Sequence, residues 1–121
     1  AEMTNATDIA EIYIAAWNET DARARRAMIA DTWTADAIYV DPLAAVAGHD
    51  GLDALIAGVQ ERFPDFRFEL IGQADGHGEN VRFSWGLGPV GADAPIKGTD
   101  FVQVEDGRLK VVTGFLDQVP G

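Results

Sequence analysis

The sequence predicts an α+β fold in which helices come first and an antiparallel sheet follows. The first half is rich in alanine, and its apolar residues recur at helical spacing. The second half alternates apolar and polar residues between turns rich in glycine and aspartate. A chain of 121 residues with no linker or repeat is expected to form one domain over residues 1–121.

Composition excludes several classes of function. The net charge of −11 repels phosphate backbones and anionic lipid, so we expect neither nucleic acid nor a membrane as partner. Cysteine is absent and there are 2 histidines, which excludes thiolate chemistry and a histidine-rich metal cage. With no apolar run near the roughly 20 residues of a membrane span and no signal-peptide pattern, a cytoplasmic location is expected.

The first predicted helix follows a cap at Thr7 or Asp8. One apolar stripe runs along it and consists of Ile9, Ile12, Tyr13, Ala16 and Trp17.

A second helix is predicted from a cap at Asp21. Its inward residues are predicted to be Ala24, Ala27, Met28 and Trp33. Its outward, solvated residues are predicted to be Arg23, Arg25 and Arg26.

A short strand is predicted over residues 37–41, because the segment is β-branched and aromatic and ends at Pro42. A third helix is predicted from Leu52 to about Arg62, with Asp50 as its cap. Phe63-Pro64-Asp65 ends this helix, since proline disfavours a helical residue before it.

A meander of strands is predicted to follow. The segments are 66–73, 80–87, 97–105 and 109–118. Asp75 to Gly78 is predicted as a turn that leaves His77 in solvent, and Asp106-Gly107 is a hairpin signal.

Two isolated acids are candidates for chemistry. Asp41 ends the first strand, where it either hydrogen-bonds the following turn or reaches a site. Asp100 shares a strand face with Val102 and Val104, and an unpaired ionised carboxylate on an apolar face costs several kcal/mol. Such a carboxylate is neutral, paired or functional.

His49 lies in the turn Gly48 to Gly51 and is either a cap or a base. Large aromatic residues are either plain core or the lining of an apolar pocket. These residues are Trp17, Trp33, Tyr39, Phe63, Phe68, Trp85 and Phe115.

The order of elements, with the motifs at 39–42, 48–51 and 98–101, resembles the SnoaL-like branch of the nuclear-transport-factor-2-like superfamily over nearly the whole chain. The resemblance implies a cone: a curved antiparallel sheet wrapped around the N-terminal helices, with a deep apolar pocket. This superfamily includes enzymes, binders and assembly modules, so the resemblance alone fixes no activity.

Within the superfamily the chain resembles ketosteroid isomerase at three positions. Asp41 before Pro42 matches its general base, Asp100 its protonated oxyanion-hole aspartate, and Tyr13 its oxyanion tyrosine. The stretch from Asp21 to Asp41 is longer here by about one helical turn. The implied chemistry moves a proton next to a carbonyl and needs no metal or cofactor.

Two other resemblances bear on the site. Polyketide cyclases of the SnoaL type use a His/Asp pair, in which His49 would serve. Epoxide hydrolases of this superfamily have an arginine where this chain has Gly98, which argues against epoxide hydrolysis.

Two hypotheses of function therefore remain. One is a cofactor-free enzyme, of isomerase or cyclase type, acting on a small hydrophobic carbonyl compound. The other is a non-catalytic module that binds a small ligand or dimerises. Apolar side chains on both faces of the meander, such as Val111 and Phe115 opposite Val112 and Leu116, predict a homodimer with sheets packed face to face.

Overall fold

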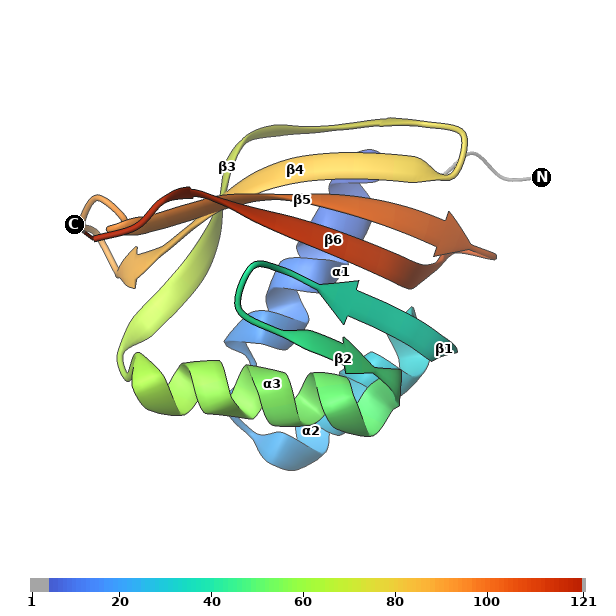
Figure 1. Cartoon of the computed structure of the whole chain (residues 1–121), viewed down its shortest axis with the longest axis horizontal. Coiled ribbons are helices and arrows are strands. Elements are labelled where there is room, and N and C mark those ends of the chain that lie inside the picture. Colours follow the sequence, from blue (N-terminus) through green and yellow to red (C-terminus); the bar gives the residue numbers. More distant parts are fainter. Residues whose placement is uncertain (1–4, 121) are drawn as a thin grey trace.

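A computed structural model describes residues 5–120, and Figure 1 shows helices on one side of a curved sheet. The elements are α1 (Ala6–Asn18), α2 (Ala22–Thr32), β1 (Trp33–Val40), β2 (Ala45–Ala47), α3 (Gly48–Arg62), β3 (Phe66–His77), β4 (Asn80–Pro89), β5 (Ile96–Glu105) and β6 (Arg108–Gln118). The predicted α+β class, with helices preceding most of the sheet, is confirmed.

The sheet has 6 strands in the order β2-β1-β6-β5-β4-β3 and is open at both ends. The prediction of a wholly antiparallel sheet is wrong in one place, because β1 pairs with β6 in parallel. A hairpin turn can join only antiparallel strands. Strands β1 and β6 are parallel, and β2, α3, β3, β4 and β5 lie between them in the chain. Local turn signals therefore gave no hint of this pairing.

Helix α1 packs its predicted stripe against β3 and β4. Its cap is Asn5, whose side-chain oxygen accepts a hydrogen bond from the Asp8 amide at 3.1 Å, so the predicted cap at Thr7 or Asp8 is wrong. Tyr13 and Trp17 are buried on the inward face as predicted.

Helix α2 begins after the predicted cap, since the Asp21 carboxylate accepts from the Ala24 amide at 2.8 Å. Its buried residues are Arg25 and Ile29, so the predicted inward face was wrong. Ala27 is exposed, and Trp33 is fully buried but opens β1 instead of extending the helix.

Arg25 is buried because three partners satisfy its guanidinium group. Its Nε donates to Asp53 at 2.7 Å, while one Nη donates to the Glu19 carbonyl at 3.0 Å and to the Gln60 side chain at 3.1 Å. Gln60 in turn donates to the Trp17 carbonyl at 3.0 Å. The cluster thus fastens α2 and the end of α1 to α3.

Helix α3 begins at Gly48, directly after β2. The predicted cap at Asp50 is wrong, since Ala47 holds the cap position without a side-chain hydrogen bond. Gly48 has a φ of 74°, which a residue with a side chain rarely adopts, and this turns the chain from strand into helix.

The meander exists as predicted, although its strands run longer than the sequence pattern indicated. His77 is exposed and ends β3 instead of lying in the turn. Asp106 and Gly107 have φ values of 51° and 79°, as the predicted tight hairpin between β5 and β6 requires. Asp100, Val102 and Val104 are buried on one face of β5.

We expect Arg25→Ala to lower the free energy of unfolding by about 3 kcal/mol, because the part-buried carboxylate of Asp53 and the side-chain amide of Gln60 then lose their hydrogen-bond partner. Arg26→Ala is the matched control, since Arg26 lies beside the same Asp53 but is mostly exposed. Urea titrations measure both variants, and equal losses would contradict the role of burial.

Candidate active site

A cavity of about 500 Å³ lies between α1, α3 and the inner face of the sheet. Of the aromatic residues predicted to line a pocket, the lining includes Trp17, Tyr39, Phe63, Phe68 and Trp85. Phe115 also borders the cavity, but its side chain is 52% exposed and packs against Phe101 on the outer face of the sheet. Trp33 is not in the lining; it is fully buried in the core, where it packs against Tyr13 at a ring distance of 5.9 Å. Tyr13, Asp41 and Asp100 also line the cavity.

Asp100 is the most confined polar group of the cavity. It is 1% exposed, and neither carboxyl oxygen has a hydrogen-bond partner among the described residues. Burial, helped by the negative charge of Asp41, raises the pKa of Asp100 to about 6. The Tyr13 hydroxyl and the Trp85 indole act in the opposite direction, yet neither completes a hydrogen bond to the carboxyl group.

Gly114 on β6 separates the two acids. A Cβ atom there would lie 2.7 Å from Asp100 Oδ1 and 3.3 Å from Asp41 Cβ. Pairing explains this arrangement, because Asp100 on β5 is the register partner of Gly114. The absence of a side chain at this position therefore lets both acids share one wall of the cavity.

Asp41 is held in place by three donors. Its Oδ1 accepts from the Leu43 amide at 2.7 Å and from the Ala44 amide at 2.8 Å, and its Oδ2 accepts from the Tyr39 hydroxyl at 2.5 Å. The acid thus orders the turn after β1, as one reading of the sequence predicted, and it also faces the cavity. Both predicted alternatives for Asp41 are compatible with this geometry.

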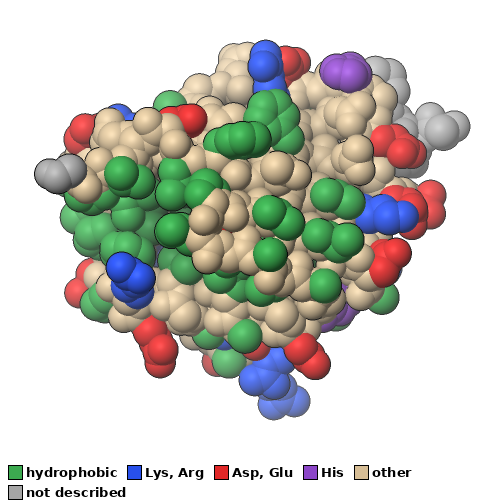
Figure 2. Space-filling view, viewed as in Figure 1, with side chains coloured by type: hydrophobic (Ala, Val, Ile, Leu, Met, Phe, Trp, Pro, Cys, Tyr) green, Lys and Arg blue, Asp and Glu red, His purple; other side chains and the backbone are tan. Residues whose placement is uncertain are grey.

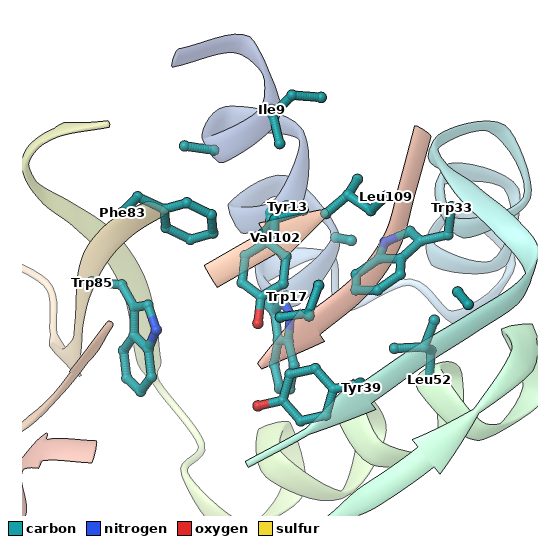
Figure 3. Packing of buried hydrophobic residues seen from close by; sticks show 14 of the residues in the cluster. Ile9, Tyr13, Trp17, Trp33, Tyr39, Leu52, Phe83, Trp85, Val102 and Leu109 are labelled. Carbon is teal, nitrogen blue, oxygen red and sulfur yellow. The ribbon is translucent and has the colours of Figure 1, made fainter. Parts of the chain in front are cut away.

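Tyr13 and Tyr39 bring phenol groups from α1 and β1 to the same region. In Figure 3 both hydroxyls border the same space, with Trp85 across it and its ring nitrogen facing them. Burial raises the pKa of both phenols, with nearby Asp100 contributing to each. Both phenols therefore stay protonated and can donate hydrogen bonds.

The comparisons with known proteins agree with this geometry. Residues 10–112 match the SnoaL-like domain family.

The chain belongs to the SnoaL-like family.

Solved structures show how far the likeness extends. A candidate isomerase of the SnoaL-like family from Agrobacterium tumefaciens shares 42% identity over 93% of this chain and 97% of its own, with a TM-score of 0.88. A candidate ketosteroid isomerase from Kribbella flavida shares 19% identity over 96% of this chain and 80% of its own, with a TM-score of 0.70.

A candidate polyketide cyclase from Sinorhizobium meliloti shares 18% identity over 88% of this chain and 93% of its own, with a TM-score of 0.70. The structures from Kribbella flavida and Sinorhizobium meliloti, at 19% and 18% identity, show that the chain shares their fold and nothing more specific. No protein with curated function matches the sequence.

His49 lies apart from the acids of this SnoaL-like site. Its Nε2 is 3.1 Å from the Trp33 carbonyl oxygen and 3.0 Å from that of Thr34, and the residue is not part of the cavity lining. The ring therefore joins the start of α3 to β1. The structure brings Tyr13, Asp41 and Asp100 together and leaves His49 outside.

Sequence reasoning missed two small residues that shape the SnoaL-like cavity. Gly114 makes room for the acids, and Gly98 makes room for the indole ring of Trp85. A Cβ atom on Gly98 would lie 2.7 Å from Trp85 Cε2 and from the Phe115 carbonyl oxygen. The only signal in the sequence was a glycine within an otherwise regular strand, which often marks a close approach.

Metal and membrane sites find no support within residues 5–120. No group of three or more His, Asp or Glu side chains there is arranged to hold a metal ion. In the same range, every helix is too short or too polar to cross a bilayer.

The only lysine or arginine in the cavity lining is Arg62, whose guanidinium lies 5.8 Å from the ring centre of Phe63.

We expect Asp100→Asn to stabilise the protein at pH 8 by up to about 3 kcal/mol, since its pKa shift of about 2 units corresponds to that energy. The unfolded chain releases the Asp100 proton near pH 4 and the folded chain near 6. Native stability therefore falls as pH rises through this window.

Urea titrations of both proteins at pH 4 and pH 8 measure this effect. The gain should shrink toward pH 4, where Asp100 is protonated in both states. A gain that is the same at both pH values would show that ionisation of Asp100 costs nothing.

Proposed function

We propose that the cavity transfers a proton on a small hydrophobic carbonyl compound without a cofactor, in a reaction of isomerase or cyclase type. The observation that carries this proposal is the convergence of Tyr13 from α1, Asp41 from the turn after β1 and Asp100 from β5 on one largely apolar cavity. Proton transfer at carbon requires an acid and a base that are held close together in a fixed geometry, and this cavity holds both.

Asp41 takes the role of general base in this proposal. Its carboxylate removes a proton from the carbon beside the carbonyl, and the electrons of that C–H bond form an enolate. In an isomerase the proton returns to a different carbon. In a cyclase the enolate carbon attacks a second carbonyl, whose C=O π electrons move to its oxygen, and that oxygen takes up the proton held by Asp41. Three hydrogen bonds fix the carboxylate, and Oδ2 keeps an unused lone pair for the proton.

Tyr13 and Asp100 take the role of donors to the enolate oxygen. A phenol and a protonated carboxylic acid both stabilise developing negative charge in a site that excludes water. Because burial holds the pKa of Asp100 near 6, the protonated acid is most abundant below that pH. The likeness at 42% identity to a candidate isomerase supports the same class of reaction.

A non-catalytic role is the second candidate, and the hydrogen bonds of Asp41 favour it. A carboxylate that already accepts from two amides and a phenol is fully explained by the order it gives the turn. In that case the cavity binds a small apolar ligand without changing it. Turnover separates the two candidates.

We also propose that a second copy of the chain covers the outer face of the sheet. Ile38, Val40, Phe101 and Phe115 are each between 41% and 52% exposed on β1, β5 and β6. Phe101 and Phe115 pack edge to face at 5.8 Å, and Figure 2 shows hydrophobic side chains gathered over this face. Such a patch on a compact protein indicates a contact surface.

We expect Asp41→Asn to reduce turnover of a β,γ-unsaturated ketone by roughly 10²–10⁴-fold, because it removes the general base. A panel of apolar carbonyl compounds assayed by ultraviolet absorbance identifies the substrate first. Circular dichroism checks that the fold is intact.

His49→Ala is the control for this experiment, since His49 lies outside the cavity lining. Full activity in Asp41→Asn together with loss in His49→Ala would replace the isomerase-like assignment by a cyclase-like one. Absence of turnover on every compound, with binding retained, would favour the non-catalytic candidate.

We expect the protein to elute at twice the mass of one chain in size-exclusion chromatography with light scattering at micromolar concentration. Phe101→Glu should shift it to a monomer, because the charge would be buried between the sheets. Val90→Glu is the control, since Val90 is 69% exposed in the loop after β4. A wild-type monomer would contradict the proposal.

A further inference from the structure

Unpartnered polar groups collect at one place in the cavity. The indole nitrogen of Trp85 and both carboxyl oxygens of Asp100 are buried without a hydrogen-bond partner, and both residues line the cavity. A buried polar group left without a partner destabilises the folded protein. A ligand that supplies the missing partners recovers this cost on binding.

The position of Trp85 is fixed by its surroundings. On β4 it pairs with Gly98 of β5, and its ring occupies the space that a side chain at Gly98 would need. Phe68 packs against the ring edge to face at 5.3 Å. The indole is 8% exposed, and in Figure 3 its nitrogen faces the hydroxyl groups of Tyr13 and Tyr39.

We propose that the Trp85 indole N–H donates a hydrogen bond to the oxygen of the bound ligand, beside the Tyr13 hydroxyl. The ligand is an apolar compound whose oxygen is carried on an sp² carbon, as in an enol or a phenol. A neutral enol or phenol oxygen accepts from the indole and donates its own hydrogen to ionised Asp100, whereas an enolate oxygen accepts from protonated Asp100. This role rests on the proposed function and adds a third hydrogen-bond donor to the same oxygen, which becomes negatively charged when the substrate loses its proton.

The other tryptophans are less suited to this role. Trp33 has an unpartnered nitrogen as well, but it is not part of the cavity lining. Trp17 does line the cavity and its indole nitrogen is unpartnered too, but its ring is packed between Tyr39 at 5.7 Å and Phe68 at 5.3 Å. The indole of Trp85, unlike that of Trp17, lies close enough to Asp100 to lower its pKa.

The experiment uses 2-naphthol as the probe and 2-methylnaphthalene as a ligand of the same shape without the oxygen. Proton–nitrogen NMR of the wild-type chain resolves the indole N–H signals of its 3 tryptophans. Each signal is assigned from the corresponding Trp→Phe variant. We expect 2-naphthol to move the Trp85 signal downfield and to leave the Trp33 signal in place.

Calorimetry then compares the affinities. Trp85→Phe keeps an aromatic ring but removes the donor, so it should weaken 2-naphthol binding roughly tenfold and leave 2-methylnaphthalene binding unchanged. Trp33→Phe is the matched control, because it deletes a buried, unpartnered N–H away from the cavity, and it should bind both ligands like the wild type.

Three results would overturn the proposal. They are equal losses for both ligands in Trp85→Phe, a Trp85 signal that 2-naphthol does not move, and a wild-type chain that binds the two ligands equally. A larger effect of Trp17→Phe on 2-naphthol would also transfer the role to Trp17. These readouts measure binding alone, so they stand even if no carbonyl compound is turned over and the proposed function fails.

Discussion

Burial of the Asp100 carboxyl group is the constraint on which the arrangement of the cavity depends. The group is 1% exposed and unpartnered, and its pKa rises to about 6 because water no longer solvates its charge. Domains keep such a group only where something compensates its cost. Within residues 5–120 no hydrogen bond compensates this cost, since the Tyr13 hydroxyl and the Trp85 indole approach without bonding to the carboxyl group. The ligand proposed above would supply the missing partners.

Two glycines make this burial possible. Gly114 leaves space for the Asp100 carboxyl group on one side, and Gly98 leaves space for the Trp85 ring on the other. Both lie within strands and are buried on the inner face of the sheet, and the register of β5 against β6 shifts at Gly98. Sheet register supplies the rest, because Trp85 pairs with Gly98 and Asp100 pairs with Gly114. The indole ring of Trp85 therefore occupies the space that a side chain at Gly98 would otherwise fill.

Local patterns in the sequence predicted the elements, and contacts between distant segments explain what they missed. The Asp21 cap, the Asp106-Gly107 hairpin and the burial of Asp100 follow from spacing alone. The burial of Arg25 does not, because its partners Asp53 and Gln60 belong to another helix. The parallel pairing of β1 with β6 and the place of His49 likewise depend on segments far apart in the chain.

The two acids divide the polar tasks of the cavity because their surroundings differ. Two like charges on one wall repel, so a stable arrangement satisfies one carboxylate and leaves the other to take up a proton. Asp41 receives two amides and the Tyr39 hydroxyl, whereas Asp100 receives no hydrogen bond from the described residues. The first is therefore the acid with a fixed orientation, which the proposed role of general base requires. The second is suited to exchange a proton with the oxygen of a ligand. Tyr39 links these tasks, since its hydroxyl holds Asp41 while its ring forms part of the apolar wall.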